Sequence, residues 1–125
     1  MRIVHLLPHR AFGEQNALQE MAALSNVGHD VIAVYAPVPG LRGVVWLETV
    51  GWREAIRARP DIVSARDLDA LGAGVKVKRR TGAKLVYDMH DPYSMMVEDN
   101  VPKCLLPLID RRERKLLRDV DLAIA

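Results

Sequence analysis

The chain has 125 residues, of which 50% are hydrophobic and 27% are charged, and this profile fits one globular domain with a buried core. A net charge of +2 is too small to indicate a nucleic-acid-binding protein. The single cysteine, Cys104, excludes an internal disulfide, and no apolar run approaches the ~20 residues needed to cross a bilayer. We therefore expect a cytoplasmic protein.

Short apolar runs alternate with helical patterns along the chain. The expected strands are residues 3–7, 31–36, 44–47, 61–65, 84–87 and 122–125. The expected helices are residues 14–27, 52–59, 68–80 and 108–119. This alternation is typical of an α/β domain with a Rossmann-like, doubly wound parallel sheet of about six strands and helices on both faces. The last strand has no closing helix after it, so we expect the single domain, residues 1–125, to be part of a longer protein.

Segments with polar residues follow three of the expected strands, at residues 8–13, at Arg66 and Asp67, and at residues 88–91. The candidate site residues in them are Arg10, Gly13, Asp67, Asp88, His90 and Asp91. Because ligands of open parallel sheets bind outside the carboxyl ends of the strands, these residues are candidates for one site. Asp67 has an alternative role as the capping residue of the helix at 68–80.

His90 is the strongest candidate in this set. An imidazole titrates near neutrality and both donates and accepts hydrogen bonds, and Asp88 and Asp91 can orient it or keep it protonated. The same three side chains are competent metal ligands, but a mixed site needs another ligand from elsewhere, so we expect no metal. His5, inside the first strand, is expected to be a core histidine.

Two further patterns have competing explanations. The glycines at 72 and 74 lie inside a helical pattern, so they indicate close packing of that helix on the sheet and not a dinucleotide-binding loop. The helix at 108–119 is basic and amphipathic, which leaves a peripheral membrane contact open beside the simpler interpretation as a solvated, salt-bridged face.

Several segments together resemble the N-terminal domain of family-4 glycosyltransferases, the retaining group with the two-domain GT-B architecture. They are MRIVHLLP at 1–8, GHDV at 28–31, PDIV at 60–63, ARD at 65–67, GAKLVYDMHD at 82–91, ERKLL at 113–117 and VDLAIA at 120–125. The resemblance covers nearly the whole chain. Phe12 stands where the family usually has the first of two glycines, and Asp91 stands where glutamate is more common.

The resemblance implies a function that neither composition nor spacing shows. A nucleotide-sugar is the donor substrate, no further cofactor is needed, and the donor binds to a C-terminal domain that is absent here. The N-terminal domain holds the acceptor, which is a small molecule, a lipid or a glycan. His90 matches the family's histidine that contacts the transferred sugar, Asp88 would orient it, and Gly13 matches the glycine near the donor diphosphate.

The remaining positions complete this expectation. Arg10, Asp67 and Asp91 would line the acceptor pocket, and the isolated domain would be inactive. The alternative is a free-standing Rossmann-like or flavodoxin-like binding module without catalysis.

Overall fold

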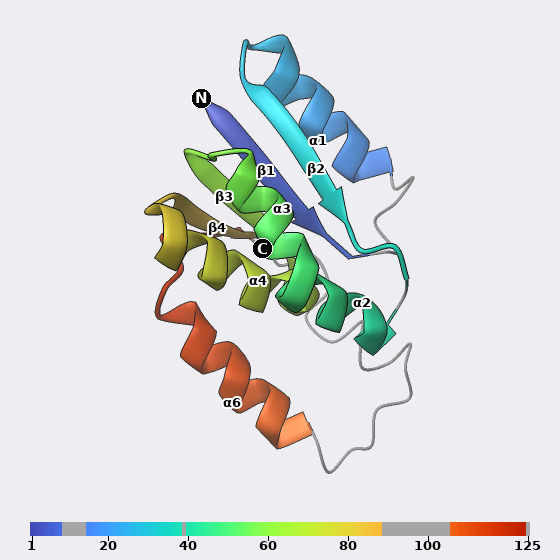
Figure 1. Cartoon of the computed structure of the whole chain (residues 1–125), viewed down its shortest axis with the longest axis vertical. Coiled ribbons are helices and arrows are strands. Elements are labelled where there is room, and N and C mark those ends of the chain that lie inside the picture. The colour runs from blue at the N-terminus through green and yellow to red at the C-terminus, as the bar shows by residue number, and fades with distance from the viewer. Residues whose placement is uncertain (9–14, 39, 89–105, 125) are drawn as a thin grey trace.

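The computed structural model describes residues 1–8, 15–38, 40–88 and 106–124. The strands are β1 (Arg2–Leu7), β2 (Asp30–Tyr35), β3 (Ile62–Arg66), β4 (Lys84–Asp88) and β5 (Leu122–Ile124). The helices are α1 (Gln15–Asn26), α2 (Gly40–Trp46), the π-helical η2 (Leu47–Gly51), α3 (Trp52–Arg57), α4 (Asp67–Thr81) and α6 (Leu106–Leu117). The described strands form one parallel sheet in the order β2-β1-β3-β4-β5 (Figure 1). The predicted α/β fold is confirmed, with five strands in place of six.

The strand predicted at residues 44–47 is wrong, because this segment is helical. The backbone at Trp46 and Gly51 is right-handed helical, so α2, η2 and α3 follow one another without a break. The buried positions Leu47, Gly51 and Ala55 recur every four residues, which is a helical period. The valines and Trp46 favour a strand by local propensity, but burial of this face against α4 requires a helix.

The main core lies between one face of the sheet and the helices that follow β2 and β3. Its sheet residues are Val4, Leu6, Val34, Val63, Ala65, Leu85 and Tyr87. Helix α4 packs on β3, β4 and β1, as Figure 1 shows. A Cβ atom at Gly74 would lie 2.8 Å from Leu85 Cδ1 and 3.0 Å from Ala65 Cβ, so the predicted close helix–sheet packing is confirmed at Gly74. At Gly72 this prediction is wrong, because a Cβ there would meet the Glu48 and Arg112 side chains and not the sheet.

The opposite face of the sheet carries the residues that alternate with this core. Ile3 and Leu7 are buried there but do not belong to the main core cluster. The chain steps from β1 to β2 and then returns past β1 to β3. Since such crossovers are right-handed, α1 lies on this opposite face, away from α2, α3 and α4.

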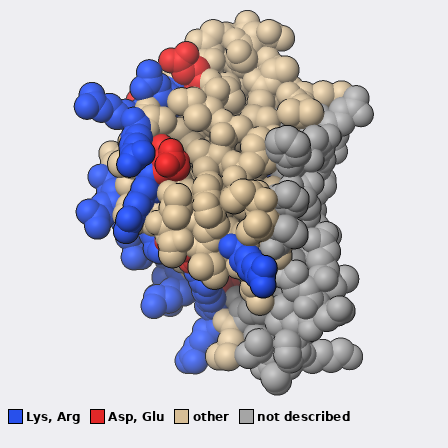
Figure 2. All heavy atoms as spheres, turned by 45° about the vertical axis from the view of Figure 1, so that its right-hand side comes forward, with Lys and Arg blue, Asp and Glu red and all other residues tan. Residues whose placement is uncertain are grey.

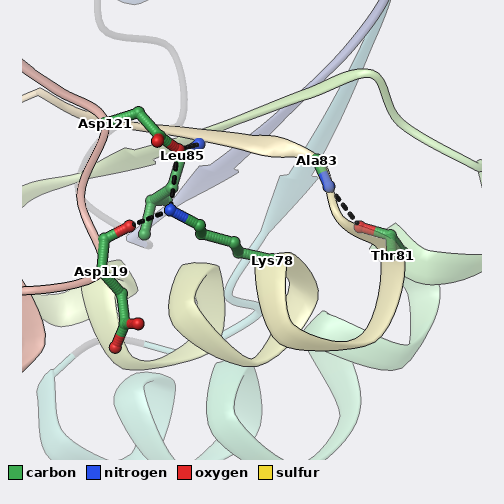
Figure 3. Close-up of polar contacts among 6 residues, drawn as sticks. All are labelled: Lys78, Thr81, Ala83, Leu85, Asp119 and Asp121. Atoms are coloured by element: carbon green, nitrogen blue, oxygen red, sulfur yellow. Dashed lines mark hydrogen bonds and ion pairs between the residues drawn. The ribbon is translucent and has the colours of Figure 1, made fainter.

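Polar contacts fasten the start of β4 to α4 and to the segment before β5 (Figure 3). Lys78 Nζ donates hydrogen bonds to the Asp119 carbonyl oxygen at 2.6 Å and to Asp121 Oδ2 at 2.9 Å. The same Asp121 oxygen accepts a hydrogen bond from the Leu85 N–H at 2.8 Å. These contacts hold β5 in register with β4 at the edge of the sheet.

Left-handed glycines follow two of the helices. Gly28 after α1 has φ +93° and Gly82 after α4 has φ +75°, both in the left-handed region. The Gly82 N–H donates to the Lys78 carbonyl oxygen at 2.8 Å. Both helices therefore end where the sequence indicates, and the chain turns directly into the next strand.

Within the described part of the chain, no helix combines the length and the apolar character needed to cross a membrane.

Candidate functional site at the carboxyl ends of the central strands

The topology places a switch point between β1 and β3. From these adjacent strands the chain leaves in opposite directions, to β2 on one side and to β4 on the other. In open parallel sheets, a crevice at the carboxyl ends of such strands is the usual place for a ligand. The last residues of β3 and β4, Arg66 and Asp88, lie at this end of the sheet.

Arg66 and Asp88 form the central contact of the site. They are register neighbours, and Arg66 Nη1 lies 3.8 Å from Asp88 Oδ2. The Arg66 side chain is only 5% exposed and that of Asp88 is 20% exposed. A guanidinium does not lose its proton in a protein, so a fixed positive charge is held at the edge of the core with a carboxylate beside it. Asp88 projects only part of its surface toward solvent.

His5 lies beside this pair on the same face of the sheet. It is the register partner of Ser64, two residues before Arg66, and it is 5% exposed. Burial, followed by the Arg66 charge, lowers the pKa of His5 to about 4. The imidazole is therefore neutral at pH 7, and among the described residues its Nε2 has no hydrogen-bond partner. The predicted core location of His5 is confirmed.

Glu20, an exposed residue of α1, has its carboxylate within electrostatic range of Asp88 and Arg66. Partial burial, then the Asp88 charge, raise the pKa of Glu20, while Arg66 opposes that rise. Arg66 is thus within electrostatic range of two acids and one neutral imidazole. Such a set can hold a polar ligand by donating from the guanidinium and accepting at the carboxylates.

Asp67 has a different environment from that of Asp88. It is the first residue of α4, so the prediction that it precedes and caps this helix is wrong; Arg66 occupies the capping position. Its side chain is 1% exposed and its φ of +59° is left-handed, a conformation that aspartate tolerates better than most residues.

The charge of Asp67 acts on Tyr87, which belongs to the main core. Burial first, and then Glu113, Asp67 and Asp69, raise the pKa of the Tyr87 hydroxyl well above its usual value. The phenol therefore stays protonated. Asp67 is electrostatically coupled to the α4 side of the sheet, whereas Asp88 lies on the α1 side.

The other predicted site residues, Arg10, Gly13, His90 and Asp91, lie outside the described residues, as does Cys104. The role of Asp88 in orienting His90 therefore stays a prediction. Among the described residues there is no group of three His, Cys, Asp or Glu side chains that could hold a metal ion.

Sequence reasoning placed Arg66 at the correct strand end but gave it no role, although a charged residue that ends an otherwise uncharged strand is a usable signal. It missed Glu20 entirely, because nothing in a helical pattern shows which distant strand end a side chain approaches. In comparisons with protein-family models and with curated proteins, nothing matches this chain.

Proposed function

We propose that this chain is the N-terminal, acceptor-binding domain of a retaining glycosyltransferase of the GT-B architecture, and that its sugar donor is a nucleotide-sugar bound by a separate C-terminal domain. The observation that supports the proposal best is the Arg66–Asp88 pair at the carboxyl ends of adjacent central strands. Hydroxyl-rich acceptors bind through hydrogen-bond donors and acceptors, and this pair supplies both at the mouth of the sheet.

The roles follow from the chemistry of each group. His90 hydrogen-bonds a hydroxyl of the transferred sugar and supports charge separation, and Asp88 orients it. Arg66 keeps Asp88 in place through their contact. Arg10 and Asp91 complete the acceptor pocket, with Gly13 near the donor diphosphate.

Asp67 fits the pocket less directly, since its buried side chain can contact an acceptor only if its neighbours move. We therefore assign Asp67 a supporting role beneath the pocket. The isolated domain binds acceptor but does not transfer sugar, because the donor half of the cleft belongs to the partner domain. No nucleic acid and no metal enter this scheme.

The first experiment is a titration of the ¹⁵N-labelled chain, followed by amide NMR, with free mono- and disaccharides and separately with uridine and guanosine diphosphates. We expect saccharides to shift the amides of His5, Arg66 and Asp88, while the nucleotides cause smaller changes. Asp88→Asn should weaken the saccharide response. Asp30→Asn is the matched control, because Asp30 makes an exposed ion pair at the opposite end of the sheet. Strong binding of a nucleotide without saccharide binding would contradict the acceptor-side assignment.

The second experiment concerns catalysis in the full-length enzyme, with its donor domain attached. His90→Ala should reduce turnover severely while the fold, followed by circular dichroism, is unchanged. Turnover equal to that of the wild type would remove His90 from the mechanism.

The alternative of a free-standing binding module is favoured by one feature, the nearly complete burial of Arg66. A buried ion pair can serve folding alone. If Asp88→Asn lowers stability and leaves every saccharide response unchanged, the pair is structural and the module is the better description.

A further inference from the structure

The site at the carboxyl ends of β3 and β4 carries more negative than positive charge on its α1 side. Arg66 contributes a permanent positive charge, while Asp88 and Glu20 each contribute a negative charge when ionised. His5 contributes none, because burial and the Arg66 charge lower its pKa to about 4 and leave the imidazole neutral at pH 7. The described groups of the site therefore favour a ligand that brings positive charge.

The charged residues that the proposed function adds to this site do not alter the balance. Arg10 and Asp91 carry opposite charges, so together they leave the excess of negative charge as it is. The preference for a positive ligand group thus holds for the whole set of residues assigned to the acceptor.

The positive charge of the chain as a whole is gathered away from this site. Helix α4 follows β3 and leads back to the start of β4, so its last turn lies toward the amino ends of the strands. That last turn is basic and contains Lys78, Arg79 and Arg80. Figure 2 shows Lys and Arg side chains gathered along one side of the molecule. The net charge of +2 is therefore no guide to the charge at the carboxyl ends of the strands.

The beginning of α4 is also unsuited to an anionic group. The start of a helix often binds a phosphate or carboxylate, because its free N–H groups and the helix dipole attract negative charge. Here the first turn contains Asp67 and Asp69, whose exposed fractions are 1% and 5%. An acceptor with a phosphate or carboxylate group would therefore meet carboxylates on both faces of the sheet.

His5 supplies a second, independent indication that a ligand binds at this place. The residue is 5% exposed, and its Nε2 has no hydrogen-bond partner among the described residues. His5 lies on the same face of the sheet as Arg66 and Asp88. In the tautomer protonated at Nδ1, the Nε2 atom accepts a hydrogen bond from an N–H or O–H group. A buried polar atom without a partner costs free energy, so a ligand that donates to it is favoured.

From the charge balance and the unpartnered imidazole nitrogen we propose that this site selects a hydroxylated acceptor that carries a protonated amino group, such as an amino sugar or an aminocyclitol. The ammonium group would lie near the Asp88 and Glu20 carboxylates, and a neighbouring hydroxyl would donate to His5 Nε2. Arg66 would donate to hydroxyl oxygens of the acceptor. The inference rests on the proposed function and names the class of acceptor for the site described above.

The test compares three saccharides that differ in charge: glucosamine, which is cationic when its amine is protonated, neutral glucose, and anionic glucuronate. Each is titrated into the ¹⁵N-labelled chain at low ionic strength, and the amides of His5, Arg66 and Asp88 are followed by NMR. Glucosamine should bind roughly fivefold more tightly than glucose, because a pair of opposite unit charges at about 4 Å contributes about this factor even in bulk water. Glucuronate should bind more weakly than glucose, and high salt should reduce both differences.

Glu20→Gln tests the source of the preference at an exposed position, where the change does not disturb packing. The ratio of glucosamine to glucose affinity should fall to roughly twofold, since the Asp88 carboxylate remains. Glu54→Gln is the matched control: it removes the same charge from α3, where Glu54 lies 3.7 Å from Arg57, and the ratio should stay as in the wild type. The amide spectrum of each variant shows that it is folded.

The outcomes separate this inference from the proposed function. Equal binding of glucosamine and glucose, or a preference for glucuronate, overturns the selectivity for an amine and leaves the acceptor-side assignment in place. A preference for glucosamine that Glu20→Gln does not lower also overturns it, because the amine would then be bound elsewhere. If none of the three saccharides shifts these amides, the proposed function fails and the inference fails with it.

Discussion

Replacement of Gly74 by alanine tests how tightly α4 packs on the sheet. The new Cβ would lie 2.8 Å from Leu85 Cδ1 and 3.0 Å from Ala65 Cβ, whereas carbon atoms in contact prefer roughly 3.5–4.0 Å. Leu85 is fully buried, and the Ala65 Cβ cannot rotate away because it is fixed to the β3 backbone. Relief therefore requires α4 to move off the sheet.

The magnitude follows from two opposing terms. A Gly-to-Ala change in a helix interior stabilises by about 1 kcal/mol, while extra volume in a tightly packed core costs about 1–3 kcal/mol. Because backbone-fixed atoms are involved, we expect the upper part of that range and a net loss of about 1–2 kcal/mol in the free energy of unfolding. Urea unfolding followed by circular dichroism measures it.

Gly72→Ala is the matched control on the same helix. Its new Cβ would meet the side-chain ends of Glu48 and Arg112, which can swing aside. The gain in helix propensity is the same, so we expect a change within about 1 kcal/mol of zero. Equal destabilisation by the two substitutions, or a stabilising Gly74→Ala, would refute the view that the contact with β3 and β4 sets the position of α4.

Three further predictions concern charged groups. For His5, the folded pKa of about 4 lies below the ordinary 6.5, so the unfolded chain binds the proton more readily. The contribution of His5 to the free energy of unfolding is therefore complete above pH 6.5 and falls by up to about 3 kcal/mol as the pH drops toward 4. His5→Gln should flatten that fall in urea titrations at different pH values. Asp88→Asn should lower the free energy of unfolding by about 1–3 kcal/mol, because Arg66 stays charged and nearly buried. Asp88→Leu combined with Arg66→Met should recover part of this loss. A double variant that is no more stable than the single one would show that the Arg66–Asp88 ion pair is not the cause of the loss. The Leu85 amide and Lys78 lower the pKa of Asp121, so the stabilisation that Asp121 gives the fold is present above the ordinary pKa of aspartate and is lost on acidification. Lys78→Met should speed amide hydrogen exchange at Leu85 and in β5. Unchanged exchange would show that the contacts drawn in Figure 3 do not hold this strand.

Local patterns in the sequence were sufficient for most of the fold. Continuous apolar runs marked the central strands β1, β3 and β4, because strands covered on both faces have few polar positions. The same kind of run marked β2, although this edge strand is mostly exposed or half-buried. Gly28 and Gly82 marked the ends of α1 and α4, since only a left-handed residue closes a helix in this way. The wrong strand prediction at residues 44–47 also came from a local pattern, because β-branched residues favour a strand. Packing of this segment against α4 instead requires buried positions at a helical spacing.

The candidate site depended on contacts that only the folded chain creates. Sequence position placed Arg66 and Asp88 at strand ends, but the parallel register of β3 with β4 decided that they pair. The approach of Glu20 to that pair and the gathering of Arg53, Lys76 and Arg80 around Trp52 join elements far apart in the chain. The sequence by itself determined which segments are strands and helices, because propensity and periodicity act between near neighbours. Tertiary packing decided which charges meet, because electrostatic contacts depend on distance in space and not on separation along the chain.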